Sequence, residues 1–220
     1  MLGGIDEAGR GPVIGPLVMA IVCIKPENES KLINLGVKDS KLLKPSIRNA
    51  LFQQIIDISE YHEIIAIQPK EIDDALESIN LNINKLEAQT SAKLIANSDS
   101  TKVIIDCPTT NYALYKSYIK KFLGNRYDEI EIIAENKADV NYPVVSAASI
   151  LAKVTRDNLI EELKKKHNID FGSGYTSDPL TQKFISENWS NEKYSELIRK
   201  QWETFKRLEE DKKQMKLEGY

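Results

Sequence analysis

The stretch GGIDEAGRGP, residues 3–12, stands at the start of the 220-residue chain and decides how the rest is organised. It predicts an apolar strand over residues 2–8 that runs into a glycine turn. Asp6 and Glu7 cannot point the same way along a strand, so either the strand ends there or one of them acts through its backbone or a neighbour. Buried carboxylates need a partner charge or a metal, and the Arg10 turn could bind an anion. The stretch indicates metal-dependent phosphate chemistry, with a charged hairpin turn as the alternative.

Length and composition are those of a soluble globular protein. The chain fits one domain, or one domain with a small appendage, and its apolar fraction of 41% can fill a sizeable core. No basic leader precedes the first carboxylates, and no apolar run approaches the roughly 20 residues of a membrane span. Cys23 and Cys107 lie in apolar runs and are expected as buried, reduced thiols. We therefore expect a cytoplasmic protein without membrane contact.

The charge distribution leaves a nucleic-acid partner open. The net charge of −3 by itself argues against one. Residues 51–100 hold 3 basic and 9 acidic groups, so the acidity is concentrated in one segment. A carboxylate site also becomes less negative once it binds a divalent cation.

Alternating apolar runs and turn signals predict an α/β fold with a sheet of mixed direction, antiparallel early and parallel later. A polar loop is expected at residues 25–30, and helical signals return at 180–188 and 191–213. The other predicted elements are strands at residues 2–8, 13–24, 61–68, 103–106 and 129–135, and helices at 45–58, 69–78, 84–96, 112–123 and from 143 past 153.

Carboxylates occur where the predicted strands end. Asp106 closes a β-branched run before Pro108, and Asp139 precedes the long helix, where an N-cap is the alternative role. At adjacent strand ends Asp6, Asp106 and Asp139 can converge, and oxygen ligands of this kind suit Mg²⁺ or Mn²⁺. The two histidines lie away from these motifs, so zinc is not expected. The pattern indicates metal-assisted phosphoryl transfer.

Five motifs, in this order, resemble ribonuclease HII: GIDEAGRG at 4–11, DSK at 39–41, ID at 105–106, KAD followed by YPVVSAASILAK within 137–153, and GSGY at 172–175. The resemblance implies the ribonuclease H fold with a five-stranded mixed sheet and a helical C-terminal part. It also implies an endoribonuclease that hydrolyses the RNA strand of RNA/DNA hybrids and cuts 5′ of ribonucleotides embedded in duplex DNA, leaving 3′-hydroxyl and 5′-phosphate ends. Such an enzyme removes misincorporated ribonucleotides and RNA primers.

The resemblance also assigns residues. Asp6, Glu7, Asp106 and Asp139 match the family's four acidic residues, which hold Mg²⁺ or Mn²⁺ on both sides of the scissile phosphodiester. The substrate-binding matches are Gly9, Arg10 and Gly11 for ribose 2′-hydroxyls, Tyr175 for the sugar at the RNA–DNA junction, and Ser40, Lys41, Lys153 and Arg156 for phosphates.

Alternatives remain for several of these. Tyr175 could simply be tucked under a glycine loop, and Lys153 and Arg156 could lie on a solvated helix face. Leu42 stands where the family usually has a second lysine, Asn136 where it often has histidine and Thr176 where proline is frequent. These departures leave the four carboxylates intact but could alter substrate affinity.

We expect the chain to divide into three parts: a catalytic domain at residues 1–170, a helical subdomain at 171–213 and a tail at 214–220. An apolar stripe in the subdomain is expected to pack on the catalytic domain; gripping the DNA strand is compatible with this. In the tail, Gln214, Leu217 and Tyr220 resemble a sliding-clamp-binding peptide, with a frayed terminus as the alternative. The cations that could grip DNA are Arg199, Lys200, Lys206 and Arg207.

Two rival functions remain beside a monomeric ribonuclease acting on RNA/DNA hybrids. A non-catalytic nucleic-acid-binding module or clamp adaptor would gain nothing from four carboxylates. A nuclease or transferase of the same fold acting on DNA would have no use for the turn at residues 9–11 or for Tyr175.

Overall fold

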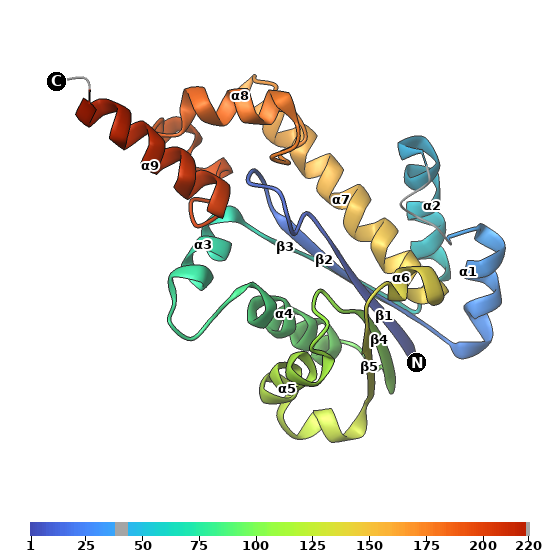
Figure 1. Ribbon diagram of the computed structural model, residues 1–220. Coiled ribbons are helices and arrows are strands. Elements are labelled where there is room, and N and C mark those ends of the chain that lie inside the picture. Colours follow the sequence, from blue (N-terminus) through green and yellow to red (C-terminus); the bar gives the residue numbers. More distant parts are fainter. Residues whose placement is uncertain (38–43, 219–220) are drawn as a thin grey trace.

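A single sheet of mixed direction lies at the centre of the molecule (Figure 1). The structure, a computed structural model, describes residues 1–37 and 44–218. The strands are β1 (Leu2–Ala8), β2 (Leu17–Ile24), β3 (Tyr61–Ile67), β4 (Lys102–Asp106) and β5 (Glu131–Glu135). Their order is β3-β2-β1-β4-β5; β1, β2 and β3 pair antiparallel, whereas β4 runs parallel to β1 and β5. The predicted five-stranded mixed sheet is confirmed.

Helices cover both faces of the sheet. Proline occupies the first turn of four of them, where its missing N–H has no cost, and the Asn82 side chain caps a fifth. The helices are α1 (Glu29–Leu35), α2 (Pro45–Ile58), α3 (Pro69–Glu77), α4 (Ile83–Asn97), α5 (Tyr112–Leu123), α6 (Ala138–Asn141), α7 (Pro143–His167), α8 (Pro179–Asn188) and α9 (Glu203–Glu218), with 3₁₀ turns η1 (Pro26–Asn28), η3 (Gly124–Glu129) and η4 (Glu192–Leu197).

Two apolar clusters fill the space between the sheet and these helices. One joins the sheet to α4 and α5, and the other joins it to α7, α1 and α2 on the opposite face (Figure 1). All eight residues of β2 are buried, as predicted for a central strand. The sheet is therefore covered on both faces.

The long helix α7 lies directly on β1 because Gly4 has no side chain. A Cβ at Gly4 would lie 2.4 Å from the carbonyl carbon of Val144, in the first turn of α7. This close approach brings α6, which immediately precedes α7, beside the carboxyl ends of β1 and β4.

A third cluster joins the C-terminal helices to the rest of the chain. Val13, Ile14 and Ile160 pack against buried side chains of the C-terminal part, so the apolar stripe packs on the sheet domain as expected. The predicted strand at 13–24 was too long, because Gly15 has a φ of +85° and Pro16 lacks an N–H, so β2 begins only at Leu17. The buried C-terminal residues are Phe171, Phe184, Ile185, Tyr194, Leu197, Ile198 and Phe205.

Two other predicted segments differ from the structure. The continuous helical stretch at 191–213 is interrupted, because Ile198 forms a β-bridge with Ile14 and residues 198–202 join the loop after β1. The polar loop at 25–30 contains a 3₁₀ turn and the start of α1, which ends at Gly36 in the left-handed conformation.

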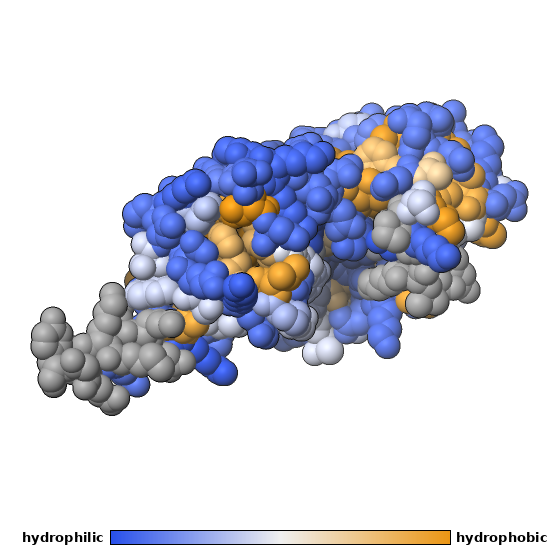
Figure 2. Space-filling view, turned by 90° about the horizontal axis from the view of Figure 1, so that it is seen from above, coloured by the Kyte–Doolittle hydropathy of each residue, from blue (hydrophilic) through white to orange (hydrophobic). Residues whose placement is uncertain are grey.

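The surface is mainly hydrophilic on the face shown in Figure 2, where apolar side chains gather in separate patches. Among the described residues, no helix is long and apolar enough to cross a membrane.

Candidate active site

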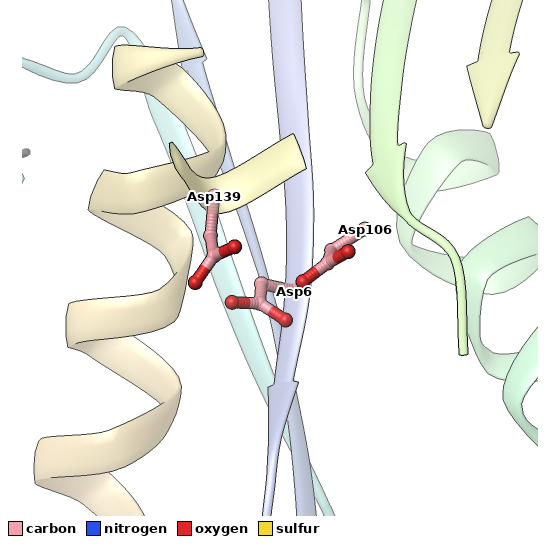
Figure 3. A group of neighbouring side chains, drawn as sticks. All are labelled: Asp6, Asp106 and Asp139. Carbon is pink, nitrogen blue, oxygen red and sulfur yellow. The ribbon is translucent and has the colours of Figure 1, made fainter. Parts of the chain in front are cut away.

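Three aspartates from different elements meet near the carboxyl ends of β1 and β4 (Figure 3). Asp6 lies on β1 and Asp106 ends the parallel neighbour β4, whose Ile105 pairs with Ile5. Asp139 lies in the first turn of α6. One carboxylate oxygen from each residue lies within 4.8 Å of the others, and Asp6 and Asp139 are almost fully buried. The predicted convergence of Asp6, Asp106 and Asp139 is confirmed.

Asp139 does not serve as the predicted N-cap alternative. Lys137 occupies the cap of α6, in the left-handed conformation, and Asp139 follows it inside the helix. Because Lys137 turns the chain sharply after β5, the carboxylate of Asp139 reaches the other two.

The buried cluster raises the cost of negative charge. Burial, and then the charge of Asp106, raise the pKa of Asp6 to about 7. Hydrogen bonds from Ser149 and from the backbone N–H of Glu7, 2.7 Å from Asp6 Oδ1, oppose this shift. Three carboxylates that repel one another in a desolvated place would be relieved by a divalent cation. The donor set therefore fits Mg²⁺ or Mn²⁺.

Glu7 points to the other face of β1. The strand continues to Ala8, so successive side chains alternate and Glu7 shares the side of Ile5, facing α4 and α5. It is not part of the group of three aspartates. Burial and the charges of Asp6 and Glu87 hold its pKa well above the usual range.

The glycine turn is held by α4. Arg10 Nε donates to Glu87 Oε1 at 2.8 Å, and Arg10 Nη2 donates to Asn84 Oδ1 at 2.8 Å. Glu87 is fully buried, and burial raises its pKa to about 7 against the opposing influence of Arg10. The Arg10 guanidinium, expected to be available to an anion, is thus engaged with the protein itself.

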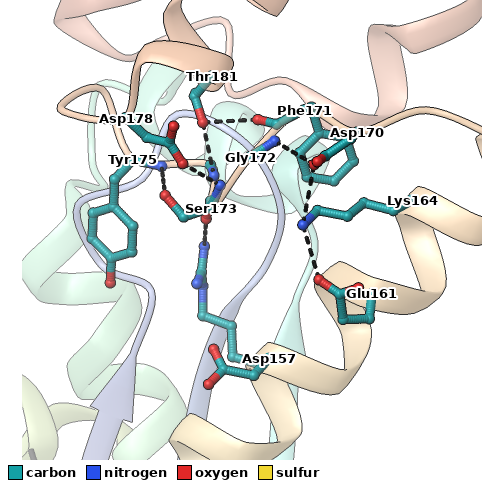
Figure 4. Close-up of polar contacts among 12 residues, drawn as sticks. Asp157, Glu161, Lys164, Asp170, Phe171, Gly172, Ser173, Tyr175, Asp178 and Thr181 are labelled. Carbon is teal, nitrogen blue, oxygen red and sulfur yellow. Dashed lines mark hydrogen bonds and ion pairs between the residues drawn. The ribbon is translucent and has the colours of Figure 1, made fainter. Parts of the chain in front are cut away.

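Behind the turn, Arg156 connects it to the loop that carries Tyr175. A Cβ at Gly9, whose φ is +83°, would lie 2.1 Å from Arg156 Nε. Arg156 is buried and donates to the carbonyl oxygen of Ser173 at 3.3 Å, and its guanidinium lies 5.2 Å from the ring centre of Tyr175. Figure 4 shows Ser173 and Tyr175 in their loop. The solvated-face alternative is therefore wrong for Arg156.

Five of the predicted substrate residues, Gly9, Arg10, Gly11, Lys153 and Tyr175, line one cavity of about 390 Å³. Lys153 Nζ pairs with Asp157 at 2.6 Å, and Arg48 approaches the same carboxylate at 3.8 Å. Tyr175 is partly exposed, so it is not simply tucked under its loop. The lining residues are Glu7, Ala8, Gly9, Arg10, Gly11, Arg48, Ser149, Lys153 and Tyr175.

Several expected residues lie elsewhere. Ser40, Lys41 and Tyr220 fall outside the described residues. Gln214 is exposed on the last turns of α9, which also includes the backbone of Leu217. Arg199, expected as a cation available to DNA, is fully buried and donates to backbone carbonyls of the turn, so that prediction was wrong.

Sequence reasoning missed Arg48, Glu87 and Ser149. Glu87 is a carboxylate on the buried face of α4, between Leu86 and Ala88, which is a signal that could have been used. Ser149 was interpreted only as a small packing residue. Nothing local distinguishes Arg48 from a solvated helix residue, since its place depends on how α2 packs on α7.

Comparison with known proteins gives a consistent result. The family model for ribonuclease HII matches residues 3–205. Ribonuclease HII from Pyrococcus furiosus is 45% identical over 219 residues, covering 98% of this chain and 94% of the relative. The crystal structure of ribonuclease H2 from Pyrococcus horikoshii OT3 aligns with a TM-score of 0.84 and 41% identity, covering 96% and 97% of the two chains. An Archaeoglobus fulgidus ribonuclease HII, solved in complex with PCNA, aligns with a TM-score of 0.83 and 36% identity, covering 94% and 96%.

Proposed function

Because the chain belongs to the ribonuclease HII family, we propose that its three converging aspartates and the turn at residues 9–11 form the active site. The protein is a metal-dependent endoribonuclease that acts on the RNA strand of RNA/DNA hybrids. The observation that carries the site assignment is the meeting of Asp6, Asp106 and Asp139 next to the cavity that Gly9, Arg10, Gly11 and Tyr175 line.

Asp6, Asp106 and Asp139 would hold Mg²⁺ or Mn²⁺. Glu7, whose side chain lies on the other face of β1, would contribute through its backbone carbonyl or through a neighbouring group. When bound, such an ion lowers the pKa of an attacking water and stabilises the leaving 3′ oxygen. Ser149 keeps the Asp6 carboxylate in place through its hydrogen bond. Burial of Asp6 and Asp139 keeps competing bulk water away from their oxygens.

The turn would recognise the ribose. Glycines at positions 9 and 11 allow backbone groups to approach a 2′-hydroxyl, which distinguishes RNA from DNA at one nucleotide. Tyr175, which lines the same cavity, would pack against the sugar at the RNA–DNA junction. Lys153 and Arg48 supply positive charge for the backbone phosphates, together with Ser40 and Lys41, while Arg156 supports Tyr175 from behind.

A substrate panel tests this proposal. The protein is incubated with Mg²⁺ or Mn²⁺ and a long RNA/DNA hybrid, a DNA duplex with one ribonucleotide, or the same duplex without it. We expect cuts in the first two, on the 5′ side of the single ribonucleotide, leaving 3′-hydroxyl and 5′-phosphate ends. Binding without any cutting would favour the adaptor function, and cutting of the all-DNA duplex would favour a DNA nuclease.

The end of α9 would bind a replication sliding clamp. Gln214, Leu217 and Tyr220 carry the pattern, and the similarity to the Archaeoglobus fulgidus protein solved with PCNA supports this proposal. Removing residues 214–220 should abolish binding to an archaeal clamp and leave kcat/KM on the single-ribonucleotide duplex unchanged. Equal clamp binding by the full and the shortened chain would contradict it.

The remaining assignments are also proposals. We place residues 1–170 in a catalytic domain and 171–213 in a helical subdomain, and we propose a cytoplasmic monomer that removes misincorporated ribonucleotides and RNA primers. Sedimentation at micromolar concentration would test the monomeric state.

A further inference from the structure

The carbonyl groups of the turn at residues 9–11 all accept hydrogen bonds from one C-terminal segment. Arg199 Nη2 donates to Gly9 O at 2.6 Å and Nη1 to Arg10 O at 3.0 Å. Trp202 Nε1 donates to Gly11 O at 2.9 Å. The segment lies about 190 residues along the chain from the turn, so the contact depends on the tertiary fold alone.

The side chain of Arg199 binds backbone carbonyls of the turn and of Gly15. Its side chain is fully buried, and Nε donates to a further carbonyl, that of Gly15, at 2.9 Å. Within residues 1–37 and 44–218 it forms no ion pair with a carboxylate. Burial and the charge of Arg156 lower the pKa of Arg199 to about 9. Burying the guanidinium costs free energy, and its hydrogen bonds to the three carbonyls offset this cost. These bonds fix the backbone at Gly9, Arg10 and Gly15.

The segment is itself held firmly. The backbone N–H of Arg199 donates to Val13 O at 2.9 Å, and the N–H groups of Lys200 and Gln201 donate to the Asp73 carboxylate at 2.8 and 2.9 Å. The guanidinium of Arg199 also lies 4.8 Å from the ring centre of Trp202. Residues 199–202 are therefore anchored on α3 and on the loop before β2, and they can hold the turn in one orientation.

Fixing the carbonyls determines what the turn offers to a ligand. Within the described residues, the backbone N–H groups of Arg10 and Gly11 donate no hydrogen bond. With the carbonyl oxygens of Gly9 and Arg10 directed toward Arg199, the N–H groups on the other side of the same two peptides, those of Arg10 and Gly11, remain for an acceptor such as a ribose hydroxyl. Trp202 holds the carbonyl of the next peptide, which joins Gly11 to Pro12 and has no N–H, and so fixes the end of the turn.

We propose that Arg199 and Trp202 are positioning residues for ribose recognition, which hold the carbonyls of residues 9–11 so that the turn selects a ribonucleotide over a deoxyribonucleotide. This proposal rests on the proposed role of the turn. It gives the C-terminal part a share in substrate selectivity through the turn.

The test is a selectivity ratio measured with the complete, metal-loaded enzyme. KM is measured for a DNA duplex with one ribonucleotide, and Ki for the same all-DNA duplex as a competitive inhibitor; Ki/KM reports selectivity. Trp202→Phe keeps an aromatic ring at this position and removes the indole N–H that donates to Gly11 O. We expect it to lower Ki/KM about fivefold, the value of one hydrogen bond, through KM, with kcat changing less than threefold and Ki unchanged.

Trp189→Phe is the matched control, since Trp189 is the residue that follows α8 and packs against the apolar cluster of the C-terminal part. It should leave the ratio as in the wild type. Arg199→Lys keeps the charge but not the three-way contact and should lower the ratio further. The proposal would be overturned if Trp202→Phe left Ki/KM unchanged, or if it raised KM and Ki by the same factor. A wild-type ratio near 1 would instead refute the proposed role of the turn.

Discussion

Asp6 illustrates how a single residue can oppose stability in favour of function. It is 3% exposed, and its pKa of about 7 lies far above the ordinary value of 3.8 because burial and Asp106 disfavour its charge. Between these two values the metal-free folded state holds more protons than the unfolded chain, so raising the pH destabilises it. The full penalty is present above pH 7.

Replacing this carboxylate should therefore stabilise the metal-free protein. We expect Asp6→Asn, in EDTA at pH 8, to unfold several degrees above the wild type, because 1 kcal/mol corresponds to roughly 2–4 °C in a chain of this size. The difference should shrink toward pH 4, where the wild-type carboxyl is protonated. Thermal unfolding across this range measures it, and a lower melting temperature of Asp6→Asn at pH 8 would contradict it.

Individual residues of the site were predictable from the sequence only where they belong to a recognisable motif. Asp6, Asp106 and Asp139 follow from strand ends and from the resemblance. The ion pair between Arg10 and Glu87 could not be predicted, because the partners are 77 positions apart and no local pattern pairs them.

Among the elements, the contact of α7 with β1 has the most direct effect on the site. It depends on Gly4, where any side chain would collide with the backbone of Val144. Because the colliding atoms belong to the backbone, the strain cannot be relieved by a change of rotamer.

Gly4→Ala should accordingly cost about 1–3 kcal/mol or more, a fall in melting temperature of roughly 2–12 °C. It should also reduce the rise in melting temperature that Mg²⁺ causes, since Asp139 would move away from Asp6. Gly36→Ala is the control: its Cβ meets nothing within 4 Å, although its φ of +71° adds strain. Thermal unfolding with and without Mg²⁺ distinguishes the two, and an unchanged Mg²⁺ effect in Gly4→Ala would contradict the account.

Elements with strong periodicity or proline starts, such as α2, α4 and β2, were predictable from the chain. The segments at 13–16 and 198–202 were not, since each takes its conformation from the other through the Ile14–Ile198 bridge. Local propensity says nothing about a partner so distant in sequence. The same long-range contact carries the positioning of the turn.

At the scale of the whole molecule, an acidic chain with a net charge of −3 must bind a polyanion through a local cluster of cations. Lys153 and Arg48 lie in the cavity beside the turn, where they can face the phosphates. The net charge alone argued against a nucleic-acid partner, because it does not show where the charges lie.

Salt dependence should reveal this local cluster. If Lys153 contacts one phosphate, Lys153→Ala should reduce the slope of log affinity against log salt by about 0.9, at all substrate sequences. Lys102→Ala, at the opposite end of β4, should leave the slope as it is. Titrations of the single-ribonucleotide duplex between low and moderate salt measure both slopes, and equal slopes in wild type and Lys153→Ala would exclude this contact.

The measurement that tests the central claim most directly compares cleavage of the single-ribonucleotide duplex by the wild type and by Asp6→Asn, Asp106→Asn and Asp139→Asn over a Mg²⁺ titration. Because the three carboxylates share one site, we expect each folded variant to lose at least about a hundredfold in kcat, a loss of roughly 2.7 kcal/mol in transition-state stabilisation. The wild type should cut 5′ of the ribonucleotide and stop in EDTA. Near-normal, metal-dependent cleavage by any folded variant would contradict the account.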